Sequence, residues 1–363
     1  MNQNKTYFIA EAGVNHNGDK AMAIRLIEEA AMAGANAIKF QTFNAKKITS
    51  KTLEKANYQK KSSKDVSSQY EMLKKLELPK SFYKDLISNA RKMKIDFIST
   101  PFDYESLSFL NSLRVPFFKI PSGEINNLPF LWKIANLKKN VILSTGMSNL
   151  SDIELALAVL NHGFISETQP KDLDEVWALW SKLDIKKFRK KVSILHCLSN
   201  YPAKDNEINL NAIKTLKKAF KITVGFSDHS LGIHLPIGAI ALGAKIIEKH
   251  FILDRNMGGP DSAFSMEPSE FKQMLDAIRD VEKALGKVNY EITPKVEKSR
   301  VFARSLFIVK DVKAGEELTK ENVRSIRPGY GLAPKYYNKI LNKKSPINIL
   351  KDEPLKSIIL KNL

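Results

Sequence analysis

Residues 223–250 read TVGFSDHSLGIHLPIGAIALGAKIIEKH. This stretch divides into an apolar run, a helix-like segment and a second apolar run: Thr223–Phe226, Ile233–Gly243 and Lys245–Glu248. The two runs show little polar alternation, which is typical of parallel strands buried on both faces. A histidine follows each run, His229 after the first and His250 after the second. The stretch therefore predicts a strand–helix–strand unit with polar side chains at the carboxyl ends of its strands.

The same alternation extends toward the N-terminus. Six earlier runs have the same character: Tyr7–Ala10, Ala37–Phe40, Phe97–Ser99, Phe117–Ile120, Val141–Leu143 and Val192–Leu195. Helix-like segments occupy most of the intervals, among them Asp19–Met32, Ser81–Met93, Ser151–Asn161, Leu210–Phe220 and, after the last run, Glu267–Leu285. Eight such units in roughly 285 residues favour an α/β fold of the (β/α)8 TIM-barrel type over the alternative, an open doubly wound sheet.

Polar side chains recur where the predicted strands end. They are Glu11, Lys39, Gln41, Thr100, Lys119, Ser122, Glu124, Ser144, His196, Ser227, His229 and His250. In a barrel these residues would surround one mouth, which is where the active sites of this fold lie. The pattern therefore predicts an enzyme rather than a structural protein.

His229 and His250 are candidate metal ligands. Two imidazoles on neighbouring strands can share one divalent cation and leave coordination positions for water and substrate. The alternative for such a pair is a structural or solvated role.

Lys39 and Lys119 lie in otherwise apolar runs. An ammonium in such a run is costly unless it meets an anion. With the hydroxyls of Thr100, Ser122, Ser144 and Ser227 nearby, the two lysines suit a phosphate plus a carboxylate. The alternative is a pair of surface lysines whose charged ends reach water.

Three carboxylates complete the predicted mouth. Glu11 and Glu124 suit acid–base work or the binding of sugar hydroxyls. Their alternative role is to pair with the lysines. Asp261 belongs to the tight loop Gly258-Gly259-Pro260-Asp261, which is also consistent with an ordinary surface turn.

The periodicity changes after Gly286. Val301–Lys310 predicts a strand and Leu318–Val323 a short helical piece. The expected organisation is a catalytic barrel at 1–286, a linker at 287–300 and a small domain at 301–363. Residues 163–191 form an insertion whose segment Asp172–Leu183 predicts an amphipathic helix.

The chain has 363 residues, 43% of them apolar, and a formal net charge of +19. Residues 287–363 hold 17 basic and 8 acidic side chains. The basic excess is mostly lysine without a nucleic-acid-binding module, so we expect no nucleic-acid partner. The single cysteine, Cys197, excludes a disulfide framework within one chain and predicts a reducing, cytoplasmic location. We expect no signal peptide and no membrane-spanning segment.

Seven ordered blocks resemble the bacterial sialic acid (nonulosonic acid) synthases. The blocks are Ala10-Glu11-Ala12-Gly13-Val14-Asn15-His16-Asn17-Gly18, Lys39-Phe40-Gln41-Thr42, Ser99-Thr100-Pro101-Phe102, Lys119-Ile120-Pro121-Ser122-Gly123-Glu124, Leu143-Ser144-Thr145-Gly146-Met147, Ser227-Asp228-His229 and Glu248-Lys249-His250-Phe251. The C-terminal segment through Arg327-Pro328-Gly329 resembles the antifreeze-like (SAF) domain of that family.

The resemblance implies condensation of phosphoenolpyruvate with an N-acetylmannosamine-type sugar, with release of phosphate. It implies that His229 and His250 hold a divalent metal ion, Mn²⁺ first and Mg²⁺ or Co²⁺ as alternatives. Matched by motif, the phosphoenolpyruvate site comprises Lys39, Thr100, Lys119, Ser122, Ser144 and Ser227. The sugar side comprises Glu11, Gln41, Glu124, Tyr201 and Asp261, with Glu124 as the first candidate for proton transfer.

The resemblance also implies a domain-swapped homodimer, in which Arg327 reaches the partner subunit's barrel. Ser199 stands where some members have Asn, so that ligand contact differs. The insertion at 163–191 leaves the identity of the sugar open, between N-acetylmannosamine and a 2,4-diacetamido-6-deoxy sugar. A related synthase acting on a phosphorylated sugar is the alternative reading.

Overall fold

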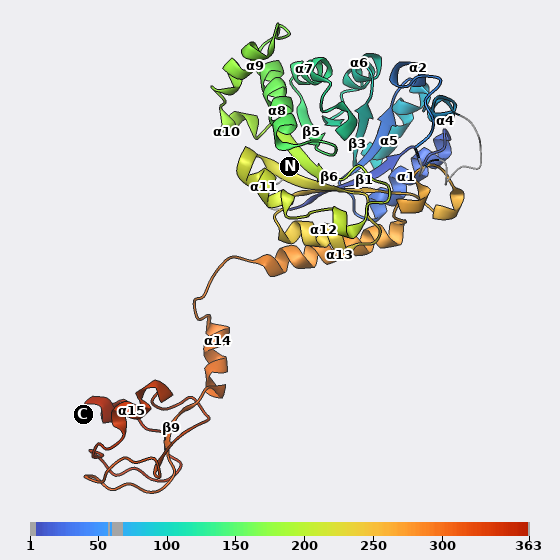
Figure 1. Ribbon diagram of the computed structural model, residues 1–363. Helices are drawn as coiled ribbons and strands as arrows, with labels where there is room; N and C mark the ends of the chain where they lie inside the picture. Colours follow the sequence, from blue (N-terminus) through green and yellow to red (C-terminus); the bar gives the residue numbers. More distant parts are fainter. Residues whose placement is uncertain (1–4, 57–58, 60–67, 362–363) are drawn as a thin grey trace. The chain divides into compact units, whose positions relative to one another are not determined.

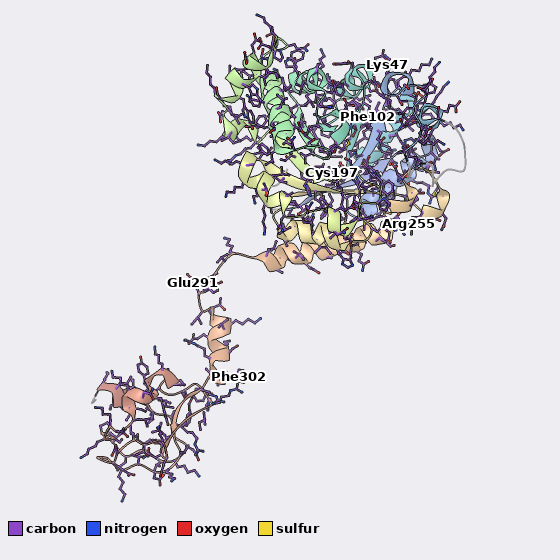
Figure 2. All side chains as sticks on the ribbon, viewed as in Figure 1. Lys47, Phe102, Cys197, Arg255, Glu291 and Phe302 are labelled. Atoms are coloured by element: carbon purple, nitrogen blue, oxygen red, sulfur yellow. The ribbon has the colours of Figure 1, made fainter. Side chains whose placement is uncertain are left out.

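Two compact units make up the chain, Met1–Gly286 and Lys287–Leu363. The structure is a computed structural model that describes residues 5–56, 59 and 68–361. Figure 1 shows strands surrounded by helices in the first unit and a small β-containing second unit. Figure 2 labels Cys197 within the first unit and Phe302 within the second.

The described residues of the first unit form an eight-stranded parallel sheet with the order β3-β2-β1-β8-β7-β6-β5-β4. The two strands at the ends of this order, β3 and β4, contact each other. The fold is therefore a nearly closed (β/α)8 barrel, which confirms the fold class predicted from sequence. The strands are β1 (Tyr7–Gly13), β2 (Ala37–Thr42), β3 (Asp96–Pro101), β4 (Phe117–Ile120), β5 (Asn140–Ser144), β6 (Val192–Cys197), β7 (Thr223–Asp228) and β8 (Ile246–His250).

Most strands extend one or two residues beyond their predicted carboxyl ends. β1 continues through Gly13 rather than stopping at Ala10, and β8 continues through His250 rather than Glu248. Most of the additional residues are charged or polar, so hydrophobicity alone does not assign them to strands. They continue the sheet because their backbone groups still pair with the neighbouring strand.

Most helices pack on the outer face of the barrel and cover it (Figure 1). Those of this unit are α1 (Lys20–Met32), α2 (Ala45–Ile48), α4 (Gln69–Leu76), α5 (Tyr83–Lys92), α6 (Tyr104–Ser112), α7 (Leu128–Asn136), α8 (Leu150–Ile165), α9 (Leu173–Trp180), α10 (Ile185–Phe188), α11 (Ala212–Phe220), α12 (His234–Ala241) and α13 (Pro268–Leu285). Short 3-10 turns are η1 (Lys80–Phe82), η2 (Ser122–Glu124), η3 (Asp205–Glu207), η4 (Arg255–Met257) and η5 (Ser262–Phe264).

Local capping explains where α1 and α9 begin. The Asp19 carboxylate accepts a hydrogen bond from the backbone N–H of Met22, and Asp172 accepts one from Glu175. These bonds satisfy backbone donors that a helix N-terminus leaves unpaired. Both helices were predicted from sequence. In the insertion, the indole of Trp180 donates to Glu154 and packs against Phe188, so this tryptophan has a structural role.

Side chains inside the barrel alternate in layers along each strand, because successive residues of a strand point to opposite faces. An apolar layer comprises Ile9, Ala37, Ile98, Phe117, Ile142, Leu195 and Ile246. Two residues further along each strand, a polar layer begins: Glu11, Lys39, Thr100, Lys119, Ser144, Cys197, Ser227 and Glu248. The apolar layer therefore closes the barrel beneath a polar cavity at its carboxyl end.

The second unit has its own core of buried Leu, Ile and Val side chains, including Leu306, Ile308, Val323 and Leu355. Its elements are α14 (Pro294–Ser299), η6 (Arg300–Phe302), β9 (Ser305–Ile308), β10 (Val323–Ile326), η7 (Pro334–Tyr336), α15 (Tyr337–Ile340) and α16 (Ile358–Lys361). β9 and β10 pair antiparallel.

The helix predicted at Leu318–Val323 is wrong. This segment is a turn that leads into β10, and its apolar ends Leu318 and Val323 both enter the small core. In the predicted linker, α14 begins at Pro294 with its N-cap at Thr293, so part of this segment is helical.

Within the described residues, no helix is long and apolar enough to cross a membrane.

Candidate active site

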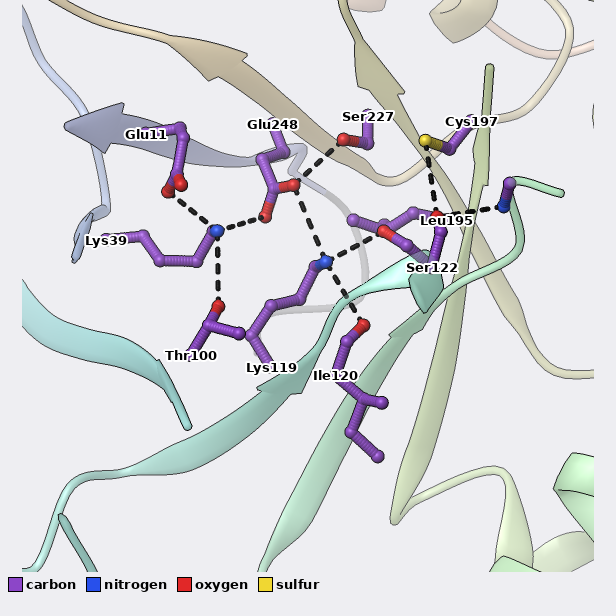
Figure 3. A network of polar contacts seen from close by, with 12 residues as sticks. Glu11, Lys39, Thr100, Lys119, Ile120, Ser122, Leu195, Cys197, Ser227 and Glu248 are labelled. Carbon is purple, nitrogen blue, oxygen red and sulfur yellow. Dashed lines mark hydrogen bonds and ion pairs between the residues drawn. The ribbon is translucent and has the colours of Figure 1, made fainter. Parts of the chain in front are cut away.

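A buried network of four charged side chains forms the floor of the cavity (Figure 3). Lys39 Nζ lies 2.7 Å from a Glu11 carboxylate oxygen and 3.6 Å from one of Glu248. Lys119 Nζ also lies 3.6 Å from Glu248. Each of these side chains is at most 6% exposed. The surface-lysine alternative for Lys39 and Lys119 is therefore wrong, whereas the pairing of Glu11 with a lysine is confirmed.

Hydroxyl groups surround this network. Lys119 Nζ donates to Ser144 Oγ at 2.7 Å and to the backbone carbonyl of Ile120 at 3.3 Å. Ser227 Oγ donates to Glu248 at 2.8 Å, and Lys39 Nζ donates to Thr100 Oγ1 at 3.4 Å. The lysine ammoniums and hydroxyls point into one cavity, which is the arrangement that an anion with several oxygen atoms requires.

Sequence reasoning missed Glu248 as a site residue. This glutamate is 5% exposed, lines the cavity and contacts both lysines. The argument that singled out Lys39 and Lys119, a charge inside an apolar run, applies equally to Ile246-Ile247-Glu248. The same argument identifies Glu248 as a candidate site residue, although the predicted strand Lys245–Glu248 treats it only as a strand end.

The pKa values of the two glutamates are shifted in opposite directions. Burial raises the pKa of the Glu11 carboxyl, and the positive charge of Lys39 only partly opposes this effect. Burial also acts to raise the pKa of Glu248, but Lys119 and Lys39 outweigh it and lower the pKa. Two neighbouring carboxyl groups whose pKa values are driven apart are suited to opposite roles in acid–base chemistry.

His229 and His250 extend from β7 and β8 above the charged layer, with ring centroids 5.5 Å apart. The Nδ1 atom of His229 lies 2.8 Å from the backbone carbonyl of Leu198. With a proton on Nδ1, the ring donates to this carbonyl and keeps a lone pair on Nε2. A metal-binding histidine commonly donates its other ring N–H to such a carbonyl.

His250 also fits a metal ligand. Its Nδ1 is buried without a hydrogen-bond partner and lies 3.7 Å from the Asp261 carboxylate. Burial lowers the pKa of His250 well below the usual value, which favours the neutral ring that metals bind. Among the described residues, no group of three or more His, Cys, Asp or Glu side chains is arranged to hold a metal. An ion on the two imidazoles would therefore complete its coordination with water or substrate.

The remaining polar residues extend the cavity, which has a volume of about 360 Å³. That volume suits a small-molecule ligand. Gln41 Nε2 donates a hydrogen bond to Glu11 at 3.4 Å. The ring centroids of Tyr201 and His229 lie 4.3 Å apart. Burial, with the charge of Glu11, raises the pKa of Asp261 to about 7. Asp261 lines the cavity, so the surface-turn alternative for it is wrong.

One wall of the cavity is apolar. It comprises Val14 after β1, Phe102 after β3, and Met72, Leu73 and Leu76 of α4. The same cavity thus offers a charged floor and an apolar side wall, which together suit a ligand with both anionic and apolar parts.

Two of the residues predicted to surround the mouth, Glu124 and His196, do not line this cavity. Glu124 accepts a hydrogen bond from Asn127 at 2.7 Å and is not among the lining residues, since the η2 turn directs it aside. Arg327 is exposed in the second unit. His196, the third histidine near a strand end, contacts the Ile208 carbonyl at 2.6 Å and stacks on Phe226 outside the cavity. The others line it, including Ser122, Ser199 and Tyr201.

A (β/α)8 barrel with buried acids, lysines and imidazoles at the carboxyl ends of its strands defines a barrel enzyme. Residues 26–290 match the NeuB family, and residues 303–357 match the SAF domain. The chain belongs to the NeuB family, as its ordered blocks predicted, and its second unit is the SAF domain.

Relatives span nearly the whole chain. The N,N'-diacetyllegionaminic acid synthase of Campylobacter jejuni is 46% identical over 96% of this chain and 98% of that protein. The synthase of the same name from Legionella pneumophila is 40% identical over 94% of this chain and 91% of that protein. The solved structure of an N-acetylneuraminic acid synthetase from Leptospira borgpetersenii is 34% identical, with a TM-score of 0.68, and the match covers 82% of this chain and 90% of that one.

Proposed function

We propose that this protein is a nonulosonic acid synthase, which condenses phosphoenolpyruvate with an N-acylated mannosamine-type sugar and releases inorganic phosphate. The buried network of Lys39, Lys119, Glu11 and Glu248 is the observation that carries the proposal. It supplies two ammoniums for an anion and two carboxyl groups of different acidity in one cavity.

The lysines and hydroxyls hold phosphoenolpyruvate. Lys119, already bonded to Ser144, and Lys39, beside Thr100, bind the phosphate and carboxylate oxygens of this ligand. In the unliganded cavity Glu248 offsets the charge of one lysine, and Glu11 in the protonated form that burial favours leaves the charge of the other lysine uncompensated. A strongly anionic substrate therefore needs further positive charge in the site, and this requirement supports a divalent cation on His229 and His250.

The metal we propose is Mn²⁺, with Mg²⁺ or Co²⁺ as alternatives. A divalent ion at His229 and His250 supplies Lewis-acid polarisation of the sugar's aldehyde oxygen. The donor set of two imidazoles fits such an ion, and Asp261 beside His250 lies where it can accept hydrogen bonds from the sugar hydroxyls.

The chain's own residues orient the reactants and move protons. Carbon 3 of phosphoenolpyruvate forms the new C–C bond with the aldehyde carbon, water adds to carbon 2, and the C–O bond to phosphate breaks. Glu11, whose pKa burial raises, can deliver a proton to the forming alkoxide. Glu248, whose pKa the lysines lower, can accept a proton from the attacking water. Glu124 lies outside the cavity, so we place it second to Glu11 and Glu248 in this role.

The sugar we propose is a 2,4-diacetamido-6-deoxy sugar, the precursor type that leads to a legionaminic acid. The apolar wall formed by Val14, Phe102 and α4 supports this choice, because it can pack against a methyl group where N-acetylmannosamine carries a hydroxyl. The names of the Campylobacter and Legionella relatives support it as well.

A sugar 6-phosphate is not favoured. Among the described residues that line the cavity, the lysines are Lys39 and Lys119, and no arginine joins them. A second phosphate would lack cationic partners of its own.

We also propose a homodimer in which the SAF domain acts on the partner subunit. Val288 and Tyr290 are more than 90% exposed in the segment that joins the two units, and Phe302 is 70% exposed. Several large apolar side chains exposed in one segment are typical of protein interfaces. Arg327, exposed in the second unit, is then available to hydrogen-bond the N-acyl carbonyl of the sugar.

Phosphate release tests the proposal. Purified protein with Mn²⁺, phosphoenolpyruvate and the 2,4-diacetamido-6-deoxy sugar should release phosphate, and a chelator should stop the release. N-Acetylmannosamine and its 6-phosphate serve as comparison substrates. No release with any of these sugars would exclude the proposed activity, whereas faster release with N-acetylmannosamine would exclude only the proposed sugar.

A further inference from the structure

A second buried ion pair lies directly behind the two histidines. Asp228 and Lys249 stand opposite each other in the pairing of β7 with β8. Lys249 Nζ lies 2.5 Å from the Asp228 carboxylate, and their side chains are 1% and 0% exposed. Each residue immediately precedes one of the histidines, on the strand face opposite to the cavity, and neither lines the cavity.

The pair binds both backbone groups of Ser230, the residue directly after His229. The other oxygen of Asp228 accepts the Ser230 N–H at 2.9 Å, and Lys249 Nζ donates to the Ser230 carbonyl at 2.6 Å. The backbone carbonyl of His229 accepts from Ala203 at 2.9 Å. The segment from Asp228 to Ser230 is thereby fixed to the residue that precedes His250.

We propose that Lys249 and Asp228 are positioning residues that hold the His229 and His250 imidazoles at the separation a shared divalent cation requires. This inference rests on the metal site of the proposed function. Lys249 and Asp228 do not contact the ion or substrate; they act through the backbone of the two strands.

Stability alone does not account for this pair. Burying an ammonium and a carboxylate costs free energy, and their attraction and hydrogen bonds roughly balance that cost. Well-packed apolar side chains of similar volume often stabilise a fold equally well. What an apolar pair cannot supply is the set of directed bonds to both backbone groups of Ser230. The specific effect of this ion pair is therefore to fix the position of the backbone at His229.

The test replaces the pair by apolar side chains in the variant Asp228→Leu/Lys249→Met. Removing both charges together leaves neither one buried without a partner. Mn²⁺ binding to the full-length protein is measured by electron paramagnetic resonance, and the histidine tautomers by ¹⁵N NMR of histidine-labelled, metal-free protein. Circular dichroism and the melting temperature report folding.

We expect a folded variant that binds Mn²⁺ roughly 10- to 100-fold more weakly, the range known for groups that orient metal ligands. The His229 signal, assigned with His229→Gln, should change from a fixed Nδ1-protonated ring to an exchanging one, since the ring loses its alignment with the Leu198 carbonyl. Asp228→Asn keeps the side-chain shape and the acceptor for the Ser230 N–H. Its Mn²⁺ affinity should lie between those of the wild type and the double variant. This variant provides the test if the double variant does not fold.

The matched control is Arg279→Met/Glu282→Leu. This ion pair, with a 2.7 Å contact, binds the backbone of Thr6 at the amino end of β1, far along the strands from the cavity. Its loss should leave Mn²⁺ affinity and the His229 tautomer unchanged.

The inference would be overturned if the Asp228→Leu/Lys249→Met protein bound Mn²⁺ within threefold of the wild-type affinity and kept the wild-type His229 signal. If only Asp228→Asn folds, the same two results in that variant would overturn it. A wild-type protein that binds no Mn²⁺ would instead contradict the metal site of the proposed function, and the His229 tautomer then decides the positioning role by itself.

Discussion

Lys119→Met is the substitution that probes the anion-binding floor most directly. The side chain is 2% exposed, and its ammonium contacts the Ser144 hydroxyl at 2.7 Å, the Ile120 carbonyl at 3.3 Å and Glu248 at 3.6 Å. Methionine keeps nearly the same volume and removes the charge. The barrel should still fold, but phosphoenolpyruvate should lose one of its two ammonium partners.

The size of the loss follows from the charges. A unit charge about 4 Å from an anion is worth roughly 4 kcal/mol at an effective dielectric constant of about 20. Truncating one partner of a buried charged contact costs about 2–5 kcal/mol in measured cases. Since about 1.4 kcal/mol is a factor of ten, we expect phosphoenolpyruvate affinity to fall by roughly 100- to 1,000-fold. Glu248 adds to the loss, because the variant leaves it with one lysine only.

Isothermal titration calorimetry with phosphoenolpyruvate measures this loss, and kcat/KM for phosphate release should fall in parallel. Lys139→Met is the matched control, because Lys139 donates to the Val115 carbonyl near the amino ends of the strands β4 and β5. Its dissociation constant should stay within about twofold of the wild type. A dissociation constant for Lys119→Met within fivefold of the wild type would refute the assignment of this lysine to the anion.

The remaining predictions concern stability, space and assembly. Burial lowers the pKa of the His16 imidazole from 6.5 to about 4. As the pH falls, His16 is therefore protonated in the unfolded chain before it is protonated in the folded protein, which favours unfolding. The free energy of unfolding, from urea denaturation, should therefore drop by roughly 3 kcal/mol more between pH 7 and pH 4 in the wild type than in His16→Gln; equal drops would contradict it. Gly146→Ala would place a methyl group 2.3 Å from a serine hydroxyl of the cavity and should lower kcat/KM at least about tenfold, whereas Gly123→Ala, where nothing lies within 4 Å, should not. Arg327→Ala and His250→Ala should each be weakly active, and mixing them should restore activity if subunits exchange; the absence of any recovery despite exchange would count against a shared site.

Sequence predicted the barrel because parallel strands buried on both faces leave a short apolar signature, and the eight predicted runs each lie on one of the observed strands. The ends of the strands were predicted too short, since Glu11 and His250 are strand residues with the chemistry of a site. The candidate cavity was predicted from the same residues, because the carboxyl ends of parallel strands converge on one mouth.

Sequence could not decide which polar residues face that mouth. Glu124 and His196 follow strand runs just as Ser122 and Ser227 do, yet a 3-10 turn directs Glu124 to Asn127, and strand alternation places His196 on the outer face. Orientation of this kind depends on the register of the barrel and on turn geometry, which a single run of residues does not reveal.

The sequence by itself determined the fold class, the family and most of the polar residues that line the cavity, because strand periodicity and ordered motifs are local properties of the chain. Only the tertiary structure decided how those residues pair. It brought Glu248 between Lys39 and Lys119, turned Glu124 aside, and joined Asp228 to Lys249 behind the histidines. The physical reason is that the cost of a buried charge depends on the partner that long-range packing provides, and that partner is distant in sequence.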